Sequence, residues 1–213
     1  MSVENELPTL LSVPSPYSAE LVNALLPFAV VKTYPPRRKI SIASQDAPLC
    51  YLIAKGKFEL HRKEDDIVMV YGKTPSVFGL GNFTSMNFGT YLKTVSACEI
   101  GIMTTSDALE QIEKHDLWKT LAQHLLVVTT KLYTFGQQIS APRTYDIIRA
   151  QILEYICEDE DLRNNTTIES YIRSKSNLSR SGIMKILLSL RTGGHIELDR
   201  GKLLKINSLP KKY

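Results

Sequence analysis

The sequence lacks any long hydrophobic run and contains only three cysteines. No stretch approaches the roughly 18 consecutive apolar residues that a membrane helix needs, and Glu4 and Glu6 stand where a secretory signal would carry positive charge. We therefore expect a cytoplasmic protein with no membrane contact. Cys50, Cys98 and Cys157 are isolated and never spaced C-x-x-C, which disfavours disulfides, zinc sites and iron–sulfur clusters. They are predicted to be reduced core thiols, with redox sensing as the alternative.

Recognisable catalytic patterns are also absent. The sequence has no G-x-S-x-G, H-E-x-x-H, P-loop or Rossmann fingerprint, and its β-like part has no histidine pair at ligand spacing. We therefore predict no catalytic residue, no metal ligand, no cofactor and no enzyme activity. A length of 213 residues, with 43% hydrophobic and 23% charged residues, allows two ordinary folded domains.

Charge is distributed unevenly along the chain. The segment from Tyr171 to Tyr213 has ten basic and two acidic residues and carries +8, whereas the whole chain carries +4, so the preceding residues carry −4. A basic end joined to a neutral or acidic body is typical of nucleic-acid-binding proteins. A solvated basic tail is the alternative that charge alone leaves open.

The first half of the chain has the pattern of a β domain. Residues 1–33 form a proline-punctuated lead in which Leu21–Leu26 can form a short helix that caps the next domain. From Tyr34 to about Met103, short β-like runs alternate with turn residues, which is typical of an antiparallel sandwich or barrel. The clearest runs are Cys50–Ala54, Lys57–His61 after Gly56, Ile67–Tyr71 after the charged turn Lys63–Asp66, and a final strand pair at Tyr91–Val95 and Glu99–Met103.

After Asp107 the apolar residues switch to a helical period. They recur at alternating steps of three and four, a heptad seam that predicts one long helix. The seam consists of Trp118, Leu121, Leu125, Val128, Leu132, Phe135 and Ile139. A strict two-in-seven seam favours a partner helix, hence a dimer, over the alternative that the helix packs on its own sheet domain. Pro142 then ends the helix and marks a hinge.

The segment after the hinge begins with a helix and an acidic run. Residues Tyr145–Cys157 are predicted to form a helix with one apolar face, and Glu158–Asp161 is most simply a solvated loop. Thr166 or Thr167 can cap a short helix, Ile168–Ser174, whose exit has a turn composition.

The next helix carries the predicted function. Ser179 can cap it, one face is apolar, and the other carries Ser181 and Lys185, with Arg180 on the flank. A β-hairpin that turns at Asp199–Gly201 follows, which completes the order of a winged helix-turn-helix. Arg180 stands in the first turn, where the helix dipole disfavours a cation. A DNA groove would compensate for this penalty, and simple solvent exposure is the alternative.

A family resemblance covers roughly Tyr34 to Ile206. The stretch Leu178–Leu190 resembles the recognition helix of CRP/FNR-type transcription regulators, with its Ser-Arg start, a basic residue five after the arginine and an Ile-Leu-x-x-Leu finish. Tyr51–Leu60 resembles the family's sensor strands around their glycine turn. The resemblance implies an α+β fold with an N-terminal double-stranded β-helix (a jelly roll like a cyclic-nucleotide-binding domain, 1–110), a long dimerisation helix (111–140) and a winged helix-turn-helix (141–213).

The resemblance also implies the partners. It implies a homodimer that binds two-fold-related sites on double-stranded DNA, with RNA polymerase as a further partner. Base contacts are carried onto Arg180 and Lys185, and more weakly onto Ser181, which departs from the acidic residue often found there. Backbone contacts with DNA are predicted for Asn177, Ser179, Arg200 and Lys202.

The predicted sensor domain departs from the family's ligand sites. The family's cyclic-nucleotide pocket uses a Gly-Glu pair and an arginine, but here Leu80 follows Gly79, and no arginine occurs between Arg62 and Arg143. We therefore predict no cyclic nucleotide in the usual mode. No haem ligand stands out among the histidines His61, His115 and His124. This motif-poor sensor resembles that of the enterobacterial IprA-like branch.

The sequence thus predicts a sequence-specific DNA-binding transcription regulator. The alternative is a protein-interaction adaptor that uses the winged helix for a partner protein. A steep loss of DNA affinity with rising salt would distinguish the regulator from the adaptor, because binding to phosphates releases counterions.

Overall fold

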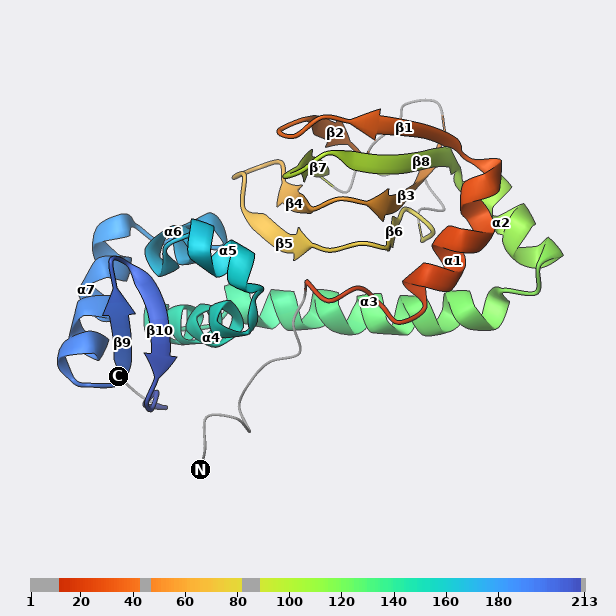
Figure 1. Ribbon diagram of the computed structural model, residues 1–213. Coiled ribbons are helices and arrows are strands. Elements are labelled where there is room, and N and C mark those ends of the chain that lie inside the picture. The colour runs from red at the N-terminus through yellow and green to blue at the C-terminus, as the bar shows by residue number, and fades with distance from the viewer. Residues whose placement is uncertain (1–11, 43–46, 82–88, 212–213) are drawn as a thin grey trace. The chain divides into compact units, whose positions relative to one another are not determined.

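The computed structural model describes residues 12–42, 47–81 and 89–211 (Figure 1). The chain divides into two compact units between Tyr133 and Thr134, inside its longest helix. Within the described ranges, no helix combines the length and the apolar character needed to span a bilayer.

The first unit contains two four-stranded antiparallel sheets. One sheet has the strand order β1-β8-β3-β6 and the other β2-β7-β4-β5. Two sheets with this order form a jelly roll. The strands are β1 (Val30–Tyr34), β2 (Lys39–Ser41), β3 (Leu49–Lys55), β4 (Phe58–Arg62), β5 (Val68–Gly72), β6 (Ser76–Phe78), β7 (Thr90–Thr94) and β8 (Cys98–Thr104).

Strand β3 shows why its sequence is a continuous apolar run. Cys50 and Leu52 belong to a core shared with helices, whereas Tyr51 and Ile53 belong to the core between the two sheets. Because both faces of the strand are buried, apolar residues replace the alternation expected of a strand with one wet face.

The predicted final strand pair is wrong in its pairing, although both strands exist. Strand β7 pairs with β2 and β4, whereas β8 pairs with β1 and β3 in the other sheet. Their adjacency in sequence suggested a hairpin, but the jelly roll sends β7 and β8 to opposite sheets. The β structure also begins at Val30, ahead of the predicted start at Tyr34.

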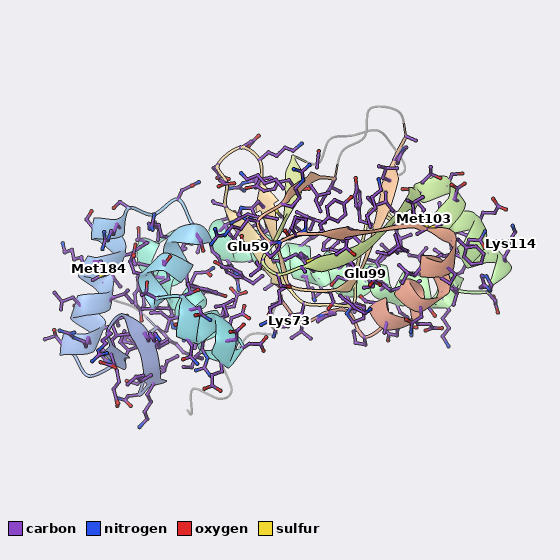
Figure 2. All side chains as sticks on the ribbon, turned by 45° about the horizontal axis from the view of Figure 1, so that its top comes forward. Glu59, Lys73, Glu99, Met103, Lys114 and Met184 are labelled. Carbon is purple, nitrogen blue, oxygen red and sulfur yellow. The ribbon has the colours of Figure 1, made fainter. Side chains whose placement is uncertain are left out.

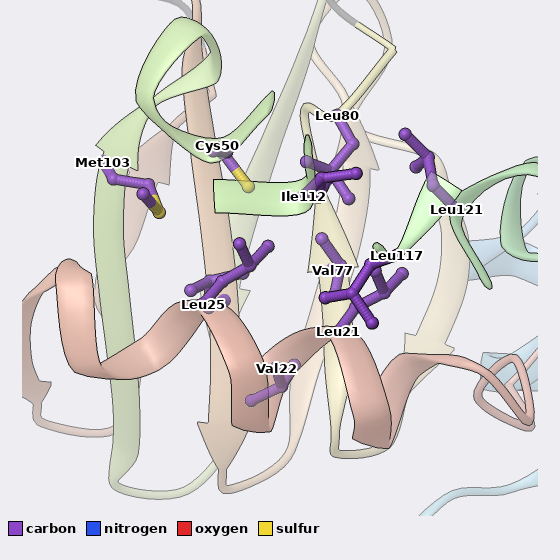
Figure 3. Packing of buried hydrophobic residues seen from close by; sticks show 12 residues of the cluster. Leu21, Val22, Leu25, Cys50, Val77, Leu80, Met103, Ile112, Leu117 and Leu121 are labelled. Carbon is purple, nitrogen blue, oxygen red and sulfur yellow. The ribbon is translucent and has the colours of Figure 1, made fainter. Parts of the chain in front are cut away.

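Helices cover one face of the sheet that contains β3. They are α1 (Ser18–Leu25), a short 3-10 turn η2 (Leu26–Phe28), α2 (Thr105–Lys114) and the beginning of α3 (Trp118–Ile139). Figure 3 shows Leu21 and Leu25 of α1 together with Cys50, Val77 and Ile112 in this helix-facing core. The predicted short helix and its capping role are confirmed.

The second unit has the predicted order of a winged helix-turn-helix. Its elements are the end of α3, then α4 (Thr144–Cys157), α5 (Glu160–Asn165), α6 (Ile168–Ser174), α7 (Arg180–Thr192), β9 (Ile196–Asp199) and β10 (Lys202–Ile206). Helix α6 packs against both α4 and α7, and β9 pairs with β10 in an antiparallel hairpin. The predicted α+β fold class is therefore confirmed in both units.

The prediction of a solvated loop at Glu158–Asp161 is only partly right, because Asp159, Glu160 and Asp161 are exposed but the segment is not all loop and Glu158 is buried. Helix α5 begins at Glu160, and Glu158 is only 3% exposed. The Tyr171 hydroxyl donates a hydrogen bond to Glu158 Oε1 at 3.1 Å. A partner 13 residues away stabilises this carboxylate in the interior, which an acidic run in the sequence does not reveal.

Candidate nucleic-acid interface

Two capped helices form the helix-turn-helix. Thr167 Oγ1 accepts a hydrogen bond from the Ser170 amide at 3.2 Å and begins α6. Ser179 Oγ accepts from the Gly182 amide, also at 3.2 Å, and begins α7. Each cap satisfies an amide that the first helical turn leaves without an intrahelical partner. Both predicted caps are confirmed, with Thr167 rather than Thr166 in the first.

Helix α7 has one buried and one exposed face, as its spacing predicts. Ile183, Leu187 and Leu190 are at most 1% exposed. The exposed residues of its first three turns are Arg180, Ser181, Met184, Lys185, Leu188 and Ser189. The helix therefore rests on the core of its unit and presents its polar and basic side to solvent.

The two predicted base-contacting cations are available on this exposed side. Neither Arg180 nor Lys185 makes an ion pair with any residue in the described part of the chain. The first turn of α7 contains no acidic residue that would offset the effect of the helix dipole on Arg180. The local sequence thus leaves a cation at a helix N-terminus without an internal counter-charge.

The two smaller polar residues near the start of α7 are less free than the sequence suggested. The Ser179 hydroxyl, predicted to be a free donor to phosphate, already caps α7 and lies 3.2 Å from Ser181 Oγ. Asn177 is exposed in the turn before α7. Ser179 therefore holds the helix start first, and a contact with DNA would share its hydroxyl.

The wing turns where the sequence predicted. Arg200 and Gly201 both have positive φ, at 46° and 82°, which is the geometry of a two-residue type I′ turn. The Ile168 amide donates a hydrogen bond to Gly201 O at 2.9 Å, which ties the wing tip to the start of α6. Arg200 is exposed at this tip, whereas Lys202 is half-buried.

A buried ion pair supports the turn between α6 and α7. Lys175 Nζ donates to Glu154 Oε1 at 2.7 Å, and both side chains are 1% exposed. The Lys175 ammonium also lies 5.1 Å from the centre of the Tyr171 ring. Lys175 is one of the ten basic residues of the segment from Tyr171 to Tyr213, but it adds no charge to the surface because α4 supplies a carboxylate 21 residues away. No local pattern distinguishes this lysine from an exposed one.

The predicted heptad seam of α3 is only partly available for a partner. Leu121 is 3% exposed and Leu125 is half-buried, and both pack in the helix-facing core of their own unit. Phe135 is also buried within the single chain, whereas Trp118 and Leu132 are exposed. Assigning Leu121 to dimerisation is therefore corrected, because the sheet domain already covers it, whereas Leu125 keeps only part of its side chain available for a partner.

A neighbouring heptad row of α3 was missed and is exposed. Leu126 and Tyr133 are 70% and 69% exposed and stand seven residues apart; exposed Thr129 lies between them, and exposed Ala122 lies four residues before Leu126. Both rows follow the same three-and-four spacing. The sequence favoured the other row because more of its residues are apolar.

Packing explains why Gly79 is followed by leucine rather than by the glutamate of the family's cyclic-nucleotide pocket. Gly79 has φ +94°, and a Cβ there would lie 2.1 Å from Leu49 O. Leu80 is 2% exposed in the core beneath the helices, rather than in the core between the sheets. Gly79 is therefore required by the backbone, and Leu80 by the core.

The sensor histidines have structural surroundings where they are buried. His61 Nε2 lies 2.9 Å from Glu59 Oε2, its Nδ1 lies 3.0 Å from Asp66 O, and its ring stacks on Tyr91. His124 is buried, and burial followed by the charge of Lys131 lowers its pKa from 6.5 to about 4. Among the described residues, no three His, Cys, Asp or Glu side chains gather as a metal site would require.

All three cysteines are free thiols, of which Cys50 and Cys98 are buried and Cys157 is half-buried. Burial raises the pKa of Cys50 to about 12 and is also the largest influence raising the pKa values of Cys98 and Cys157. Because the thiolate is the reactive form, these shifts make the thiols less reactive.

Three comparisons with known proteins agree with this geometry. A winged helix-turn-helix DNA-binding family matches residues 144–211. The chain is 30% identical over 164 residues to the Salmonella typhimurium protein called inhibitor of hydrogen peroxide resistance, covering 76% of this chain and 79% of that protein.

Two similar solved structures carry the name of a regulator. The c-di-GMP responsive global regulator CLP of Xanthomonas campestris superimposes with a TM-score of 0.67 at 16% identity, covering 89% of this chain and all of that one. A CRP/FNR family transcriptional regulator from Thermus thermophilus gives a TM-score of 0.57 at 16% identity, covering 83% of this chain and 94% of that one. At these identities the likeness shows the fold.

Proposed function

The chain belongs to the family of the protein called inhibitor of hydrogen peroxide resistance, and we propose that it is a transcription regulator that binds specific DNA sites as a homodimer. It has the fold of CRP/FNR-type regulators with a DNA-binding helix-turn-helix. The exposed face of α7 carries the proposal, since Arg180 and Lys185 stand there without an ion-pair partner in the described ranges. Such cations suit guanine acceptors in the major groove. Arg200 at the wing tip suits a phosphate.

Dimerisation is proposed through the exposed row of α3. Leu126 and Tyr133 leave large apolar surfaces in solvent on one helical face, and Leu132 is 54% exposed beside them. A second copy of the same helix would cover these side chains in a heptad packing. A two-fold dimer would place two α7 helices on two half-sites, as the two-fold-related sites of a regulator require.

The sensor domain is proposed to act without a cyclic nucleotide in the usual mode and without a metal or other cofactor. Support comes from Leu80, which packs in the core where the family resemblance expects a glutamate, and from the absence of arginine between Arg62 and Arg143 in the sequence. We place no catalytic activity in this domain. RNA polymerase as a partner and the cytoplasm as the location stay predictions.

The name of the Salmonella typhimurium relative indicates which genes this chain would regulate. We propose that the genes regulated by this chain influence resistance to hydrogen peroxide. The raised thiol pKa values of Cys50, Cys98 and Cys157 argue against direct attack of peroxide on these residues as the trigger. The effect would then run through DNA binding.

Selection from random duplex DNA tests the proposal. We expect the purified full-length protein to enrich one two-fold-related sequence and to bind it at least 1,000-fold more tightly than random duplex, on the order found for specific regulators. The affinity for both should fall steeply with salt as counterions are released. Failure to enrich any sequence, with and without cell extract to supply a ligand, would contradict the proposal and favour the protein-interaction adaptor.

A further inference from the structure

Helix α7 leaves two large apolar side chains in solvent among its cationic residues. Met184 and Leu188 are 47% and 53% exposed, although Ile183, Leu187 and Leu190 of the same helix are buried. Met184 lies on α7 in Figure 2, four residues after Arg180 and directly before Lys185. At a spacing of four, Met184 and Leu188 are neighbours on the helix surface and form one apolar ridge.

The core of the unit does not need this ridge. The buried residues of α7 occupy the opposite side, and the described chain leaves about half of Met184 and of Leu188 exposed. Single exposed apolar residues are ordinary on protein surfaces. A ridge inside a surface that otherwise carries Arg180, Ser181 and Lys185 calls for a ligand that is both anionic and locally apolar.

Duplex DNA has this combination in its major groove. Among the groups that base pairs present there, the C5-methyl of thymine is the apolar one, next to the acceptors and donors that polar side chains read. Resting on the proposed DNA binding, we propose that Met184 packs on a thymine methyl group and so selects thymine at one position of each half-site. The flexible thioether side chain of methionine adapts well to such a contact.

Helix geometry gives the approximate position of that thymine. Residues four apart are separated by about 6 Å along a helix axis, and successive bases of one strand by about 3.4 Å. Met184 therefore reaches a base about two steps from the one that Arg180 contacts. The half-site should pair a guanine read by Arg180 with a thymine about two steps away, and Leu188 extends the apolar contact toward the groove wall.

Replacing thymine by deoxyuridine tests the contact without changing the protein. The selected duplex is prepared with each thymine replaced in turn, in both half-sites, which removes the methyl group and keeps every base-pairing group. Full-length wild-type protein should lose about fourfold in affinity per half-site at one position, the loss that corresponds to one buried methyl group. The other replacements should change affinity less than twofold.

Two protein variants test whether Met184 is the residue that contacts the thymine methyl group. Met184→Ala should bind the thymine and deoxyuridine duplexes with affinities within about 1.5-fold of each other. Leu204→Ala, which removes an exposed apolar side chain from the wing strand β10 instead, should keep the fourfold preference. Circular dichroism spectra that match wild type would show that both variants are folded.

Three outcomes overturn the inference. Uniform tolerance of deoxyuridine in a well-bound operator would overturn it while leaving the proposed function intact. A Met184→Ala variant that keeps the thymine preference would also overturn the inference and leave the proposed function intact. If selection enriches no operator at all, the proposed function fails first and this contact fails with it.

Discussion

Glu154 and Lys175 form an ion pair of 2.7 Å in the interior of the helix-turn-helix unit, with 1% of each side chain exposed. The pair joins the last turn of α4 to the turn that follows α6, and the Tyr171 hydroxyl lies 3.4 Å from the same ammonium. Two charges removed from water are stable only while each has the other. The pair therefore holds the turn that leads into the recognition helix.

Removing one member of this pair should be costly. Lys175→Met leaves the Glu154 carboxylate buried without its cation, and we expect the free energy of unfolding to fall by about 3–5 kcal/mol. Urea titration at fixed protein concentration measures the loss. The control is Arg173→Met, which breaks an exposed ion pair with Glu169 on the same helix and should cost less than about 1 kcal/mol.

The double variant Glu154→Leu with Lys175→Met separates charge from packing. Because neither charge is then left alone, it should recover much of the stability lost by Lys175→Met. A double variant as unstable as the sum of its single variants would refute the view that a stranded charge causes the loss.

Substitutions in α7 and in the wing should change DNA affinity in different ways, because α7 is proposed to contact bases and the wing to contact phosphates. Arg180→Ala should weaken binding at the selected site by about 1–3 kcal/mol and relax the base preference at one position. Arg200→Ala should weaken binding to all sequences alike and lower the salt slope by about 1. Fluorescence anisotropy with selected and random duplexes measures both. Equal losses on the two duplexes for Arg180→Ala would count against its role in the major groove.

The exposed row of α3, Leu126 and Tyr133, should determine whether the protein is a dimer or a monomer. Tyr133→Asp, and equally Leu126→Asp, places a charge where a second helix would pack, so we expect folded monomers by light scattering. Leu125→Asp is the matched comparison, because Leu125 packs in the core of its own unit. That variant should lose stability, whereas its folded form should keep the mass of the dimer. A dimer that persists in Tyr133→Asp and Leu126→Asp would place the interface elsewhere.

His124 should make stability depend on pH. Its folded pKa of about 4 lies below the ordinary value of 6.5, so the unfolded chain binds a proton before the folded chain does. Stability should therefore fall as the pH drops from 6.5 toward 4, by up to about 3 kcal/mol. Urea titrations of wild type and His124→Leu between pH 7 and pH 5 measure the difference. A stability difference that stays constant over this range would refute the expectation.

The sequence alone predicted the elements that depend on near neighbours. The caps at Thr167 and Ser179, the buried spacing of Ile183, Leu187 and Leu190, and the turn at Arg200 and Gly201 all occur in the structure. Capping, helical periodicity and turn geometry act within a few residues, so local patterns contain them. The recognition helix and its exposed cations follow from the same local rules.

Only the tertiary structure decided which surfaces of these elements are free. It paired β7 and β8 with strands of different sheets, gave Lys175 a carboxylate from α4, and covered Leu121 while leaving the row of Leu126 exposed. Each outcome depends on a contact between residues far apart in the chain. A periodic pattern specifies that a side chain has an apolar or charged character, but burial is a property of the partners that folding brings to it.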